Sequence, residues 1–315
     1  MGESWRDVTH AWDALVAETT GTWPYHTATW GGLVADVFGG EFRVLRHSRC
    51  GWHVPIMLGG SLAAGGFACG HIGYGGVLAA ETPHVPLHDQ ISAAAEIEAH
   101  LGVPCTRLVT TPGTPADAAT GDSRQTLLVD LTITAEARWT AYAGSVRTAV
   151  RKCRREGLLT RLLGPSDAAA AVRLIHTTQL RVGATYQAPE HLIDRLARDT
   201  SGFSLLVGCF QRDRLLSVGV FLRAFGRVAY LFNGWDPECS RLGANYLMLH
   251  DAVERCGEQG DHVMDLGFSH APGLRAFKER WNGRPATLTV AEQPVAHASI
   301  KTTRQHQDKR SVTAQ

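Results

Sequence analysis

Alternation of apolar and polar positions predicts two similar groups of β-strands. In the first half, "EFRVLRHSRCGWHVPIMLGG" from residue 41 alternates on both sides of a tight turn, and a further apolar stretch ends in "HIGYGGVL". In the second half, "GFSLLVGCFQRDRLLSVGVFLRAFGRVAYLFNGW" repeats this order from residue 202. Phe42 and Phe203 open the two groups and Gly73 and Asn233 close them, with offsets of 161 and 160 residues. Matching offsets of this kind indicate an internal duplication.

A helix with one apolar face is predicted after each group of strands. The apolar positions recur at helical spacing in "PLHDQISAAAEIEAHLG" from residue 86 and in "RLGANYLMLHDAVERCGEQG" from residue 241. The second of these ends in a glycine, which is typical of a helix C-terminus. The short strands "TRLVTT" and "HVMDLG" follow. The order predicts an α+β fold, with a mostly antiparallel sheet flanked by helices in each half.

A change in composition predicts where the two halves join. The stretch "TPGTPADAATGDSRQ", from residue 111, is rich in Pro, Gly, Ser and Asp and is typical of a surface loop. We therefore expect an N-terminal domain over 1–124 and a C-terminal domain over 125–300. Residues 301–315 are polar, and we expect this tail to be disordered.

Composition places the chain among globular proteins without a membrane span. Of its 315 residues, 44% are hydrophobic and 19% are charged, and no apolar run approaches the ~20 residues that cross a bilayer. The start of the chain has no secretory signal pattern. Seven scattered cysteines indicate reduced thiols and a cytoplasmic protein. Because the net charge is only +1, a polyanion would have to bind at a local patch.

A cluster of cations lies on one predicted helix, "GSVRTAVRKCRREGL", from residue 144. Arg147, Arg151 and Arg154 share one face, and Lys152 and Arg155 lie beside it. The row is either a solvated charged face or a site for phosphates, which the planar guanidinium group binds well. The sequence leaves both readings open.

Several stretches from residue 126 onward resemble the Fem-type aminoacyltransferases (FemA, FemB and FemX of cell-wall bridge formation). They are "TLLVDL", "SVRTAVRKCRREGL", "HTTQLRVG", "RVAYLFNGWDPECSRLGANYLM", "VMDLG" and "GLRAFKERWNG", in the family's order. The resemblance implies a tandem pair of acetyltransferase-like (GNAT-like) domains. It also implies transfer of an amino acid from aminoacyl-tRNA, as co-substrate, to an amine acceptor, without a further cofactor. A coiled-coil arm is not expected, because no charged heptad run is present.

The same resemblance implies roles for individual residues. Phe277 and Lys278 match the catalytic-region motif, in which the lysine would stabilise an oxyanion or the terminal tRNA phosphate and the phenylalanine would hold the lysine stem or pack on the adenosine. Arg181 and Tyr230 match residues that contact the acceptor. We place four further residues with the acceptor: Trp30, Tyr74, Asn233 and His270.

Departures from the family pattern affect the predicted acceptor. No lysine follows Trp30 in "GGLVADVFGG", where cell-wall members hold a nucleotide diphosphate. We therefore favour a small amine acceptor in peptide antibiotic biosynthesis over cell-wall bridge formation, which stays an alternative. A non-catalytic tRNA-binding protein is a further alternative.

A second acyl donor is also compatible with the sequence. The stretch "SRLGANYL", with Arg241 and Gly243, resembles the pyrophosphate-binding turn of coenzyme A-dependent acetyltransferases. Together with the cations Arg147, Arg151, Lys152 and Arg155, these residues are our predicted phosphate-binding set for tRNA, and an acyl-CoA N-acyltransferase is the alternative.

No metal site is expected. Cys50 with His53, and Cys69 with His71, resemble zinc-ligand pairs only loosely, because the second pair has a single intervening residue in a strand-like stretch. "GFSHA" lacks the closing glycine of a serine hydrolase motif.

Overall fold

The computed structural model describes residues 4–63, 65–70, 72–115, 121–184, 186–268 and 272–292. The chain divides into two compact units, the first formed by 1–125 with 286–315 and the second by 126–285. The sequence places the first boundary one residue earlier, after 124. It also assigns 125–300 to a single domain, whereas the last described strand, 284–292, returns the chain to the first unit. The predicted tail 301–315 lies outside the described residues.

The first unit is built on a mixed sheet, and short helical turns lie between its first two strands. Its strands lie in the order β1-β2-β3-β4-β5-β12, and β4 pairs with β5 in parallel. The elements are β1 (Trp5–Asp7), η1 (Thr9–Ala11), α1 (Trp12–Leu15), η2 (Val16–Glu18), η3 (Pro24–His26), α2 (Ala28–Phe38), β2 (Glu41–His47), β3 (His53–Leu58), α3 (Gly60–Ala63), β4 (Phe67–Cys69), α4 (Leu87–Leu101), β5 (Cys105–Val109) and, from the end of the chain, β12 (Arg284–Glu292).

Both faces of this first sheet are covered by apolar side chains. Val44 and Leu45 are neighbours on β2, so their side chains point to opposite faces. Val44 packs in a cluster with Trp12 of α1, whereas Leu45 packs in a separate cluster with Ile97 of α4. The apolar face predicted for α4 is therefore the face that covers the sheet.

In the second unit the strands lie in the order β6-β11-β10-β9-β8-β7, with both parallel and antiparallel neighbours. Strands β8, β9 and β10 form the predicted antiparallel meander, and β10 pairs with β11 in parallel. The elements are β6 (Asp122–Asp130), α5 (Ala135–Ala141), α6 (Gly144–Arg155), β7 (Leu158–Leu162), η4 (Pro165–Asp167), α7 (Ala168–Arg181), α8 (Glu190–Ala197), β8 (Ser204–Gln211), β9 (Arg214–Ala224), β10 (Arg227–Trp235), η5 (Pro237–Leu242), α9 (Ala244–Glu258), β11 (Val263–Asp265) and α10 (Pro272–Glu279).

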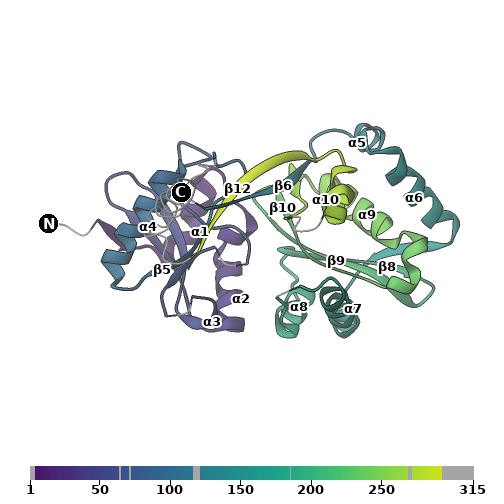
Figure 1. Cartoon of the computed structure of the whole chain (residues 1–315), viewed down its shortest axis with the longest axis horizontal. Helices are drawn as coiled ribbons and strands as arrows, with labels where there is room; N and C mark the ends of the chain where they lie inside the picture. The colour runs from purple at the N-terminus through teal and green to yellow at the C-terminus, as the bar shows by residue number, and fades with distance from the viewer. Residues whose placement is uncertain are drawn as a thin grey trace, which may run out of the picture. The chain divides into compact units, whose positions relative to one another are not determined.

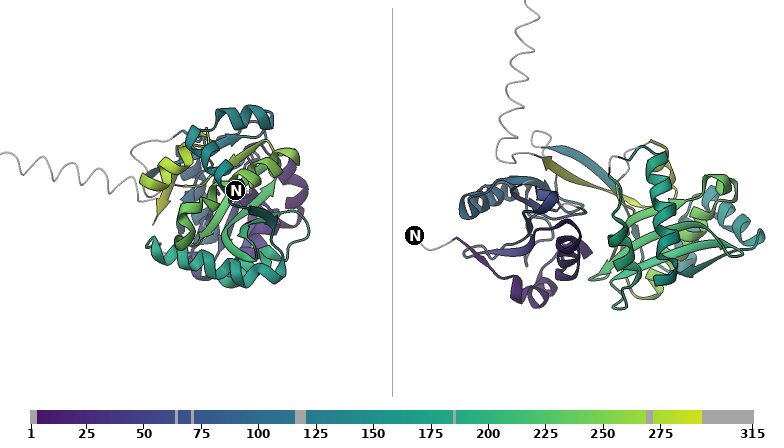
Figure 2. Two further views of the ribbon diagram at one scale, coloured as in Figure 1. Left: turned by 90° about the vertical axis from the view of Figure 1, so that its right-hand side faces the viewer. Right: turned by 90° about the horizontal axis from the view of Figure 1, so that it is seen from below.

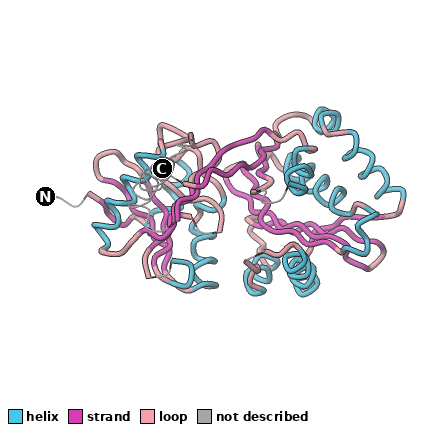
Figure 3. Tube along the Cα trace, in the orientation of Figure 1, coloured by secondary structure: helices cyan, strands magenta, loops and turns pink. Residues whose placement is uncertain are grey.

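Helices cover both faces of the second sheet, with α6 and α9 on one side of β8 and β9 and α7 and α8 on the other (Figure 1). Figure 2 shows this unit from the side of α7 and α8 in its right-hand view, and Figure 3 shows the strands as one layer between the helices. Two glycines at neighbouring register positions allow the close packing. A Cβ on Gly234 would lie 2.5 Å from the backbone N of Ile175 in α7, and one on Gly219 would lie 2.6 Å from the sulfur of Met248 in α9.

The two units repeat one topology, as the sequence offsets predict. In each, a short edge strand precedes a three-strand meander, a 15-residue helix (α4 or α9) and a parallel strand (β5 or β11). The sixth strands are exchanged. β6 follows β5 in the chain but pairs with β11, and β12 follows β11 but pairs with β5. The predicted α+β class, with a mostly antiparallel sheet in each half, is confirmed.

Among the described residues no helix has the length and apolar character needed to cross a membrane.

Candidate functional site

Lys278, near the end of α10, is a buried cation. Only 6% of the residue is exposed, although lysine is among the residues least often buried. Its Nζ donates hydrogen bonds to the carbonyl oxygens of Gly267 and Phe268, at 2.9 and 2.7 Å. Burial lowers the pKa of the Lys278 ammonium to about 8, and the nearby Asp265 carboxylate opposes this change. The lysine therefore lies inside a site in which its charge is only partly compensated.

Asp265 holds the same loop from the opposite side. It is 1% exposed at the end of β11, and its Oδ1 accepts hydrogen bonds from the Thr126 hydroxyl and, at 2.8 Å, from the Gly267 backbone N–H. Gly267 thus accepts from Lys278 and donates to Asp265. Its φ of +74° lies in the left-handed region, which glycine adopts readily.

Tyr230 lies on β10, the strand parallel to β11. Its carbonyl oxygen would be 3.2 Å from a Cβ built on Gly267, and Lys278 Nζ would be 3.8 Å from the same Cβ. The Tyr230 ring stacks on Phe221, with centroids 4.6 Å apart. Burial raises the pKa of the Tyr230 hydroxyl, and a hydrogen bond to the Asn233 side chain opposes this change. The structure therefore brings Lys278, Tyr230 and Asn233 into one region of the second unit.

Phe277 packs into the core beside this region. Its ring meets Tyr246 edge-on at 5.0 Å and Trp281 at 6.0 Å between centroids. Arg280, further along the same segment, donates to the Tyr246 hydroxyl at 3.0 Å. Phe277 thus anchors α10 to α9 and fixes the position from which Lys278 points inward.

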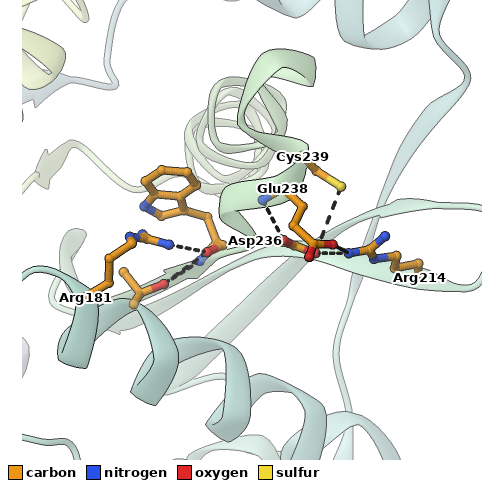
Figure 4. Close-up of polar contacts among 7 residues, drawn as sticks. Arg181, Arg214, Asp236, Glu238 and Cys239 are labelled. Carbon is orange, nitrogen blue, oxygen red and sulfur yellow. Dashed lines mark hydrogen bonds and ion pairs between the residues drawn. The ribbon is translucent and has the colours of Figure 1, made fainter.

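Arg181, at the end of α7, is exposed and is oriented by the end of β10. Its Cζ lies 3.8 Å from the centroid of the Trp235 ring, and Nη1 donates to the Trp235 carbonyl at 3.4 Å. Figure 4 shows Arg181 on one side of this strand end and, on the other, Arg214 with Asp236 and Glu238. Arg181 pairs with no carboxylate among the described residues, so its guanidinium group can bind an anionic ligand.

The predicted phosphate-binding set on α6 separates into two groups. Arg147 donates to the carbonyls of Thr140 (2.7 Å) and Tyr142, and Lys152 donates to the Arg241 carbonyl at 2.6 Å. These two cations therefore have structural partners. The exposed members of the set are Arg151, whose Cζ is 5.4 Å from the Trp139 ring centroid, together with Arg155 and Arg241.

The second unit contains a match to a known family. Residues 141–279 match the family model "Acetyltransferase (GNAT) domain". This match agrees with the meander, the parallel strand β11 and the helices on both faces. Residues 141–279 have the fold of a GNAT-type domain.

The GNAT-type domain is part of a chain that resembles tandem structures as a whole. The chain is similar to the crystal structure of FemX, with a TM-score of 0.66, 11% identity and coverage of 94% of this chain and 98% of that one. It also resembles a C-terminal domain described as lysylphosphatidylglycerol synthetase from Agrobacterium fabrum (TM-score 0.57, 12% identity, 95% of each chain). L-PGS from Bacillus licheniformis gives a TM-score of 0.52 at 12% identity, covering 89% of this chain and 96% of that one. No curated protein matches the sequence. At these identities the likeness concerns the fold, and it confirms the predicted tandem architecture.

The loop before α9 in the GNAT-type domain is held by α6. Gly243 is the N-cap of α9, with a left-handed φ of +77°. Cys153 donates to the carbonyls of Leu242 and Gly243, at 3.0 and 3.3 Å, and Lys152 holds the preceding carbonyl. The predicted pyrophosphate turn is therefore held by hydrogen bonds from α6.

Trp30 and Tyr74, predicted to contact the acceptor, belong to the first unit. They are 4% and 3% exposed, and both rings meet Tyr25 edge-on, with centroids 5.6 and 5.2 Å apart. Together they line a cavity of about 40 Å³. The structure brings these two residues together as aromatic packing, and their acceptor role stays a prediction. His270 lies outside the described residues.

Sequence reasoning missed three contributors to the site. Gly267 and Thr126 were not singled out, and Trp235, which orients Arg181, was not either. One signal was present: in "VMDLG" an aspartate ends a buried strand and a glycine follows two residues later, a combination that suits a tight polar turn.

Proposed function

We propose that this protein transfers an amino acid from aminoacyl-tRNA to an amine acceptor, forming an amide bond. The observation that carries the proposal is Lys278, a buried lysine that sits beside the end of β11 in a GNAT-type domain and points at the loop after that strand. The resemblance of the motifs to the Fem-type family, and of the whole fold to FemX, supports the choice of donor.

The chemistry needs little beyond alignment and charge. The acceptor nitrogen attacks the ester carbonyl carbon, a tetrahedral oxyanion forms, and the bond to the ribose oxygen then breaks while the amine loses a proton. Lys278 has three N–H donors, and two of them bind carbonyls. The third is free among the described residues and can donate to the developing oxyanion.

Arg181 and the exposed cations have separate roles in this proposal. Arg181, stacked on Trp235, would bind an anionic group of the acceptor such as a carboxylate. Arg151, Arg155 and Arg241 would bind phosphates of the tRNA. We place the acceptor among small amines of peptide antibiotic biosynthesis, because no lysine follows Trp30 within "GGLVADVFGG". A cell-wall precursor is the alternative acceptor.

A second candidate is acyl transfer from an acyl-CoA. The observation that favours it is the family match together with the turn at Gly243, which lies at the N-terminus of α9, where backbone amides can bind a pyrophosphate. A non-catalytic tRNA-binding role is less compatible with a lysine kept buried at an energetic cost.

One assay separates these readings. Purified protein is incubated with a pool of radiolabelled aminoacyl-tRNAs and a cell extract as the source of acceptor. We expect labelled product that ribonuclease abolishes and that acetyl-CoA cannot replace. Product that survives ribonuclease in the presence of an acyl-CoA would assign the protein to the second candidate, and tRNA binding without any product would assign it to the third.

A further inference from the structure

The turn between β2 and β3 places a thiol against an imidazole. Cys50 is exposed in this turn, and its Sγ lies 2.7 Å from Nδ1 of His47. The backbone N–H of Cys50 also donates to that Nδ1, at 3.3 Å. Because a backbone N–H can only donate, Nδ1 is the unprotonated nitrogen of the neutral ring. It can therefore take the proton of the thiol.

His47 is itself held in position by its surroundings. Its Nε2 lies 3.5 Å from Oε2 of Glu96 on α4, and the ring contacts Trp5 and Trp52, with centroids 4.9 and 6.3 Å away. The indole N–H of Trp5 donates to the same Glu96 oxygen at 3.2 Å. A nucleophile, a base within hydrogen-bond reach and a third group that orients the base form the arrangement that activates cysteines for nucleophilic attack.

Two arginines, Arg46 and Arg49, lie at the same turn. Arg46 extends over it, since a Cβ built on Gly51 would lie 4.0 Å from the Nη2 of this arginine. Arg49 precedes Cys50 directly and is exposed. Nearby cations attract an anionic reactant.

The other cysteines lack this environment. All seven lie in the described part of the chain, and Cys50 is the only exposed one. Burial raises the pKa of both Cys209 and Cys256 to about 12. The remaining cysteines are buried or, at Cys239, half-buried and beside the Asp236 carboxylate.

We propose that Cys50 is a modification site that forms a mixed disulfide with small anionic disulfides. The thiol proton passes to His47 Nδ1, and the Cys50 thiolate attacks one sulfur of the small disulfide. The bond between the two sulfurs of that molecule breaks, and the departing thiolate takes the proton from His47. Cys50 is oxidised and the small disulfide is reduced, so no further oxidant is required. This step uses none of the residues assigned to aminoacyl transfer.

The test uses the full chain with glutathione disulfide as the anionic probe, and the adduct is located by mass spectrometry. We expect rapid modification of the Cys50 peptide and none at that peptide in Cys50→Ser. Without a neighbouring base, only a few per cent of a thiol is thiolate at neutral pH, so removing the imidazole should slow the reaction. The loss is reduced because a more basic thiolate is the stronger nucleophile. We therefore expect His47→Gln to slow the reaction about tenfold at pH 7. Glu96→Gln should slow it by about threefold and, because Glu96 is largely exposed, should leave the fold intact.

Two outcomes would overturn the proposal. One is equal rates in wild type, His47→Gln and Glu96→Gln, with circular dichroism showing that each variant is folded. The other is an adduct found first at Cys239. The charge preference is tested with cystamine, a cationic disulfide. Arg49→Gln should slow the reaction of Cys50 with glutathione disulfide and accelerate its reaction with cystamine. If Arg49→Gln changed both reaction rates by the same factor, the proposed preference for anionic disulfides would be wrong.

Discussion

The two units share a topology but differ in the segment between the fifth strand and the strand that follows it in the chain. In the second unit this segment contains α10, and α10 carries Lys278. In the first unit it is the Pro- and Gly-containing stretch after β5, whose described residues, 110–115 and 121, form no helix. One copy thus places a buried cation at the end of its fifth strand, and the described residues of the other hold no such cation there. The framework therefore occurs in both units, and the lysine on which the proposed transfer depends lies in the second.

The two units also differ in the kind of side chain that they bury. The first unit buries a cluster of aromatic rings, including Tyr25, Trp30 and Tyr74, with little space between them. The second unit buries charged side chains beside a strand end, Asp265 and Lys278, and binds them to backbone groups. Buried charge is costly unless it is compensated, so a lysine kept in this position indicates a function.

The difference between the two units is tested most strongly by Lys278→Met, from which we expect the largest loss of transfer rate. This substitution keeps the stem of the side chain and removes its charge. If the third N–H donates to the oxyanion, the loss is about 3–4 kcal/mol of transition-state stabilisation, or a factor of about 10²–10³ in rate. Lys278→Arg should recover little, because the planar fork does not fit a site shaped for an ammonium. Single-turnover transfer measures the effect.

Arg275→Ala is the matched control, since Arg275 lies on the same helix, is exposed and pairs with Glu279. It should leave the rate within a few-fold of wild type. A folded Lys278→Met variant with near-normal turnover would remove the catalytic distinction between the two units.

Arg181→Gln is expected to weaken acceptor binding. A charge-assisted hydrogen bond is worth about 1.5–3 kcal/mol, so KM for the acceptor should rise about 10- to 100-fold with little change in kcat. Arg214→Gln, on the other side of the same strand end and already paired with Asp236 and Glu238, is the control. Equal effects of the two substitutions on KM would contradict the assignment of Arg181.

The pH dependence should reveal the charge state of Lys278. With a pKa of about 8, the active ammonium is lost as the pH rises through that value. The ratio of wild-type to Lys278→Met rates should fall about tenfold between pH 7 and pH 9. A ratio that rises over this range would instead make the neutral amine the active form, as expected for a general base.

The same titration affects folding with a defined sign. The pKa of Lys278 is about 8 in the folded chain, against the ordinary 10.5, so between these values the unfolded chain binds more protons. The contribution of this residue to the free energy of unfolding therefore increases as the pH rises through that range.

Some of this comparison could be predicted from the sequence and some could not. The period of two in the strands and the helical spacing in α4 and α9 gave the repeat, because each pattern reports which side chains are buried. The exchange of β6 and β12 was not predictable, since both are apolar strands and their pairing depends on partners far away in the chain.

The site shows the same division. A sequence motif pointed to Lys278, but its burial depends on the carbonyls of Gly267 and Phe268, which a motif does not place. Arg147 was predicted to bind phosphate because it shares a helix face with Arg151. In the structure, Arg147 instead donates hydrogen bonds to carbonyls of the segment before α6. Helical spacing shows which residues share a face, but it does not show which of them have a protein partner.

A smaller effect is expected when the exposed cations of α6 are removed. Each phosphate contact contributes about 0.7–0.9 to the slope of log K against log salt, so Arg151→Ala with Arg155→Ala should reduce the slope for tRNA binding by about 1.5. Arg147→Ala should instead lower the melting temperature, because it removes hydrogen bonds at the junction of α5 and α6. An unchanged slope in the double variant would make α6 a solvated face.

The smallest effect is expected in the first unit. Cys50 lies on a turn of that unit, and its thiol contacts His47. His53 is buried against Trp12, with ring centroids 5.4 Å apart. An ester donor is already activated and needs neither a thiol nor a metal for aminolysis. Cys50→Ala and treatment with a chelator should therefore each leave aminoacyl transfer within about twofold of wild type, a change typical of surface substitutions. A loss of transfer together with stoichiometric zinc in the purified protein would show that the first unit contributes chemistry of its own, and the contrast between the two units would then have to be redrawn.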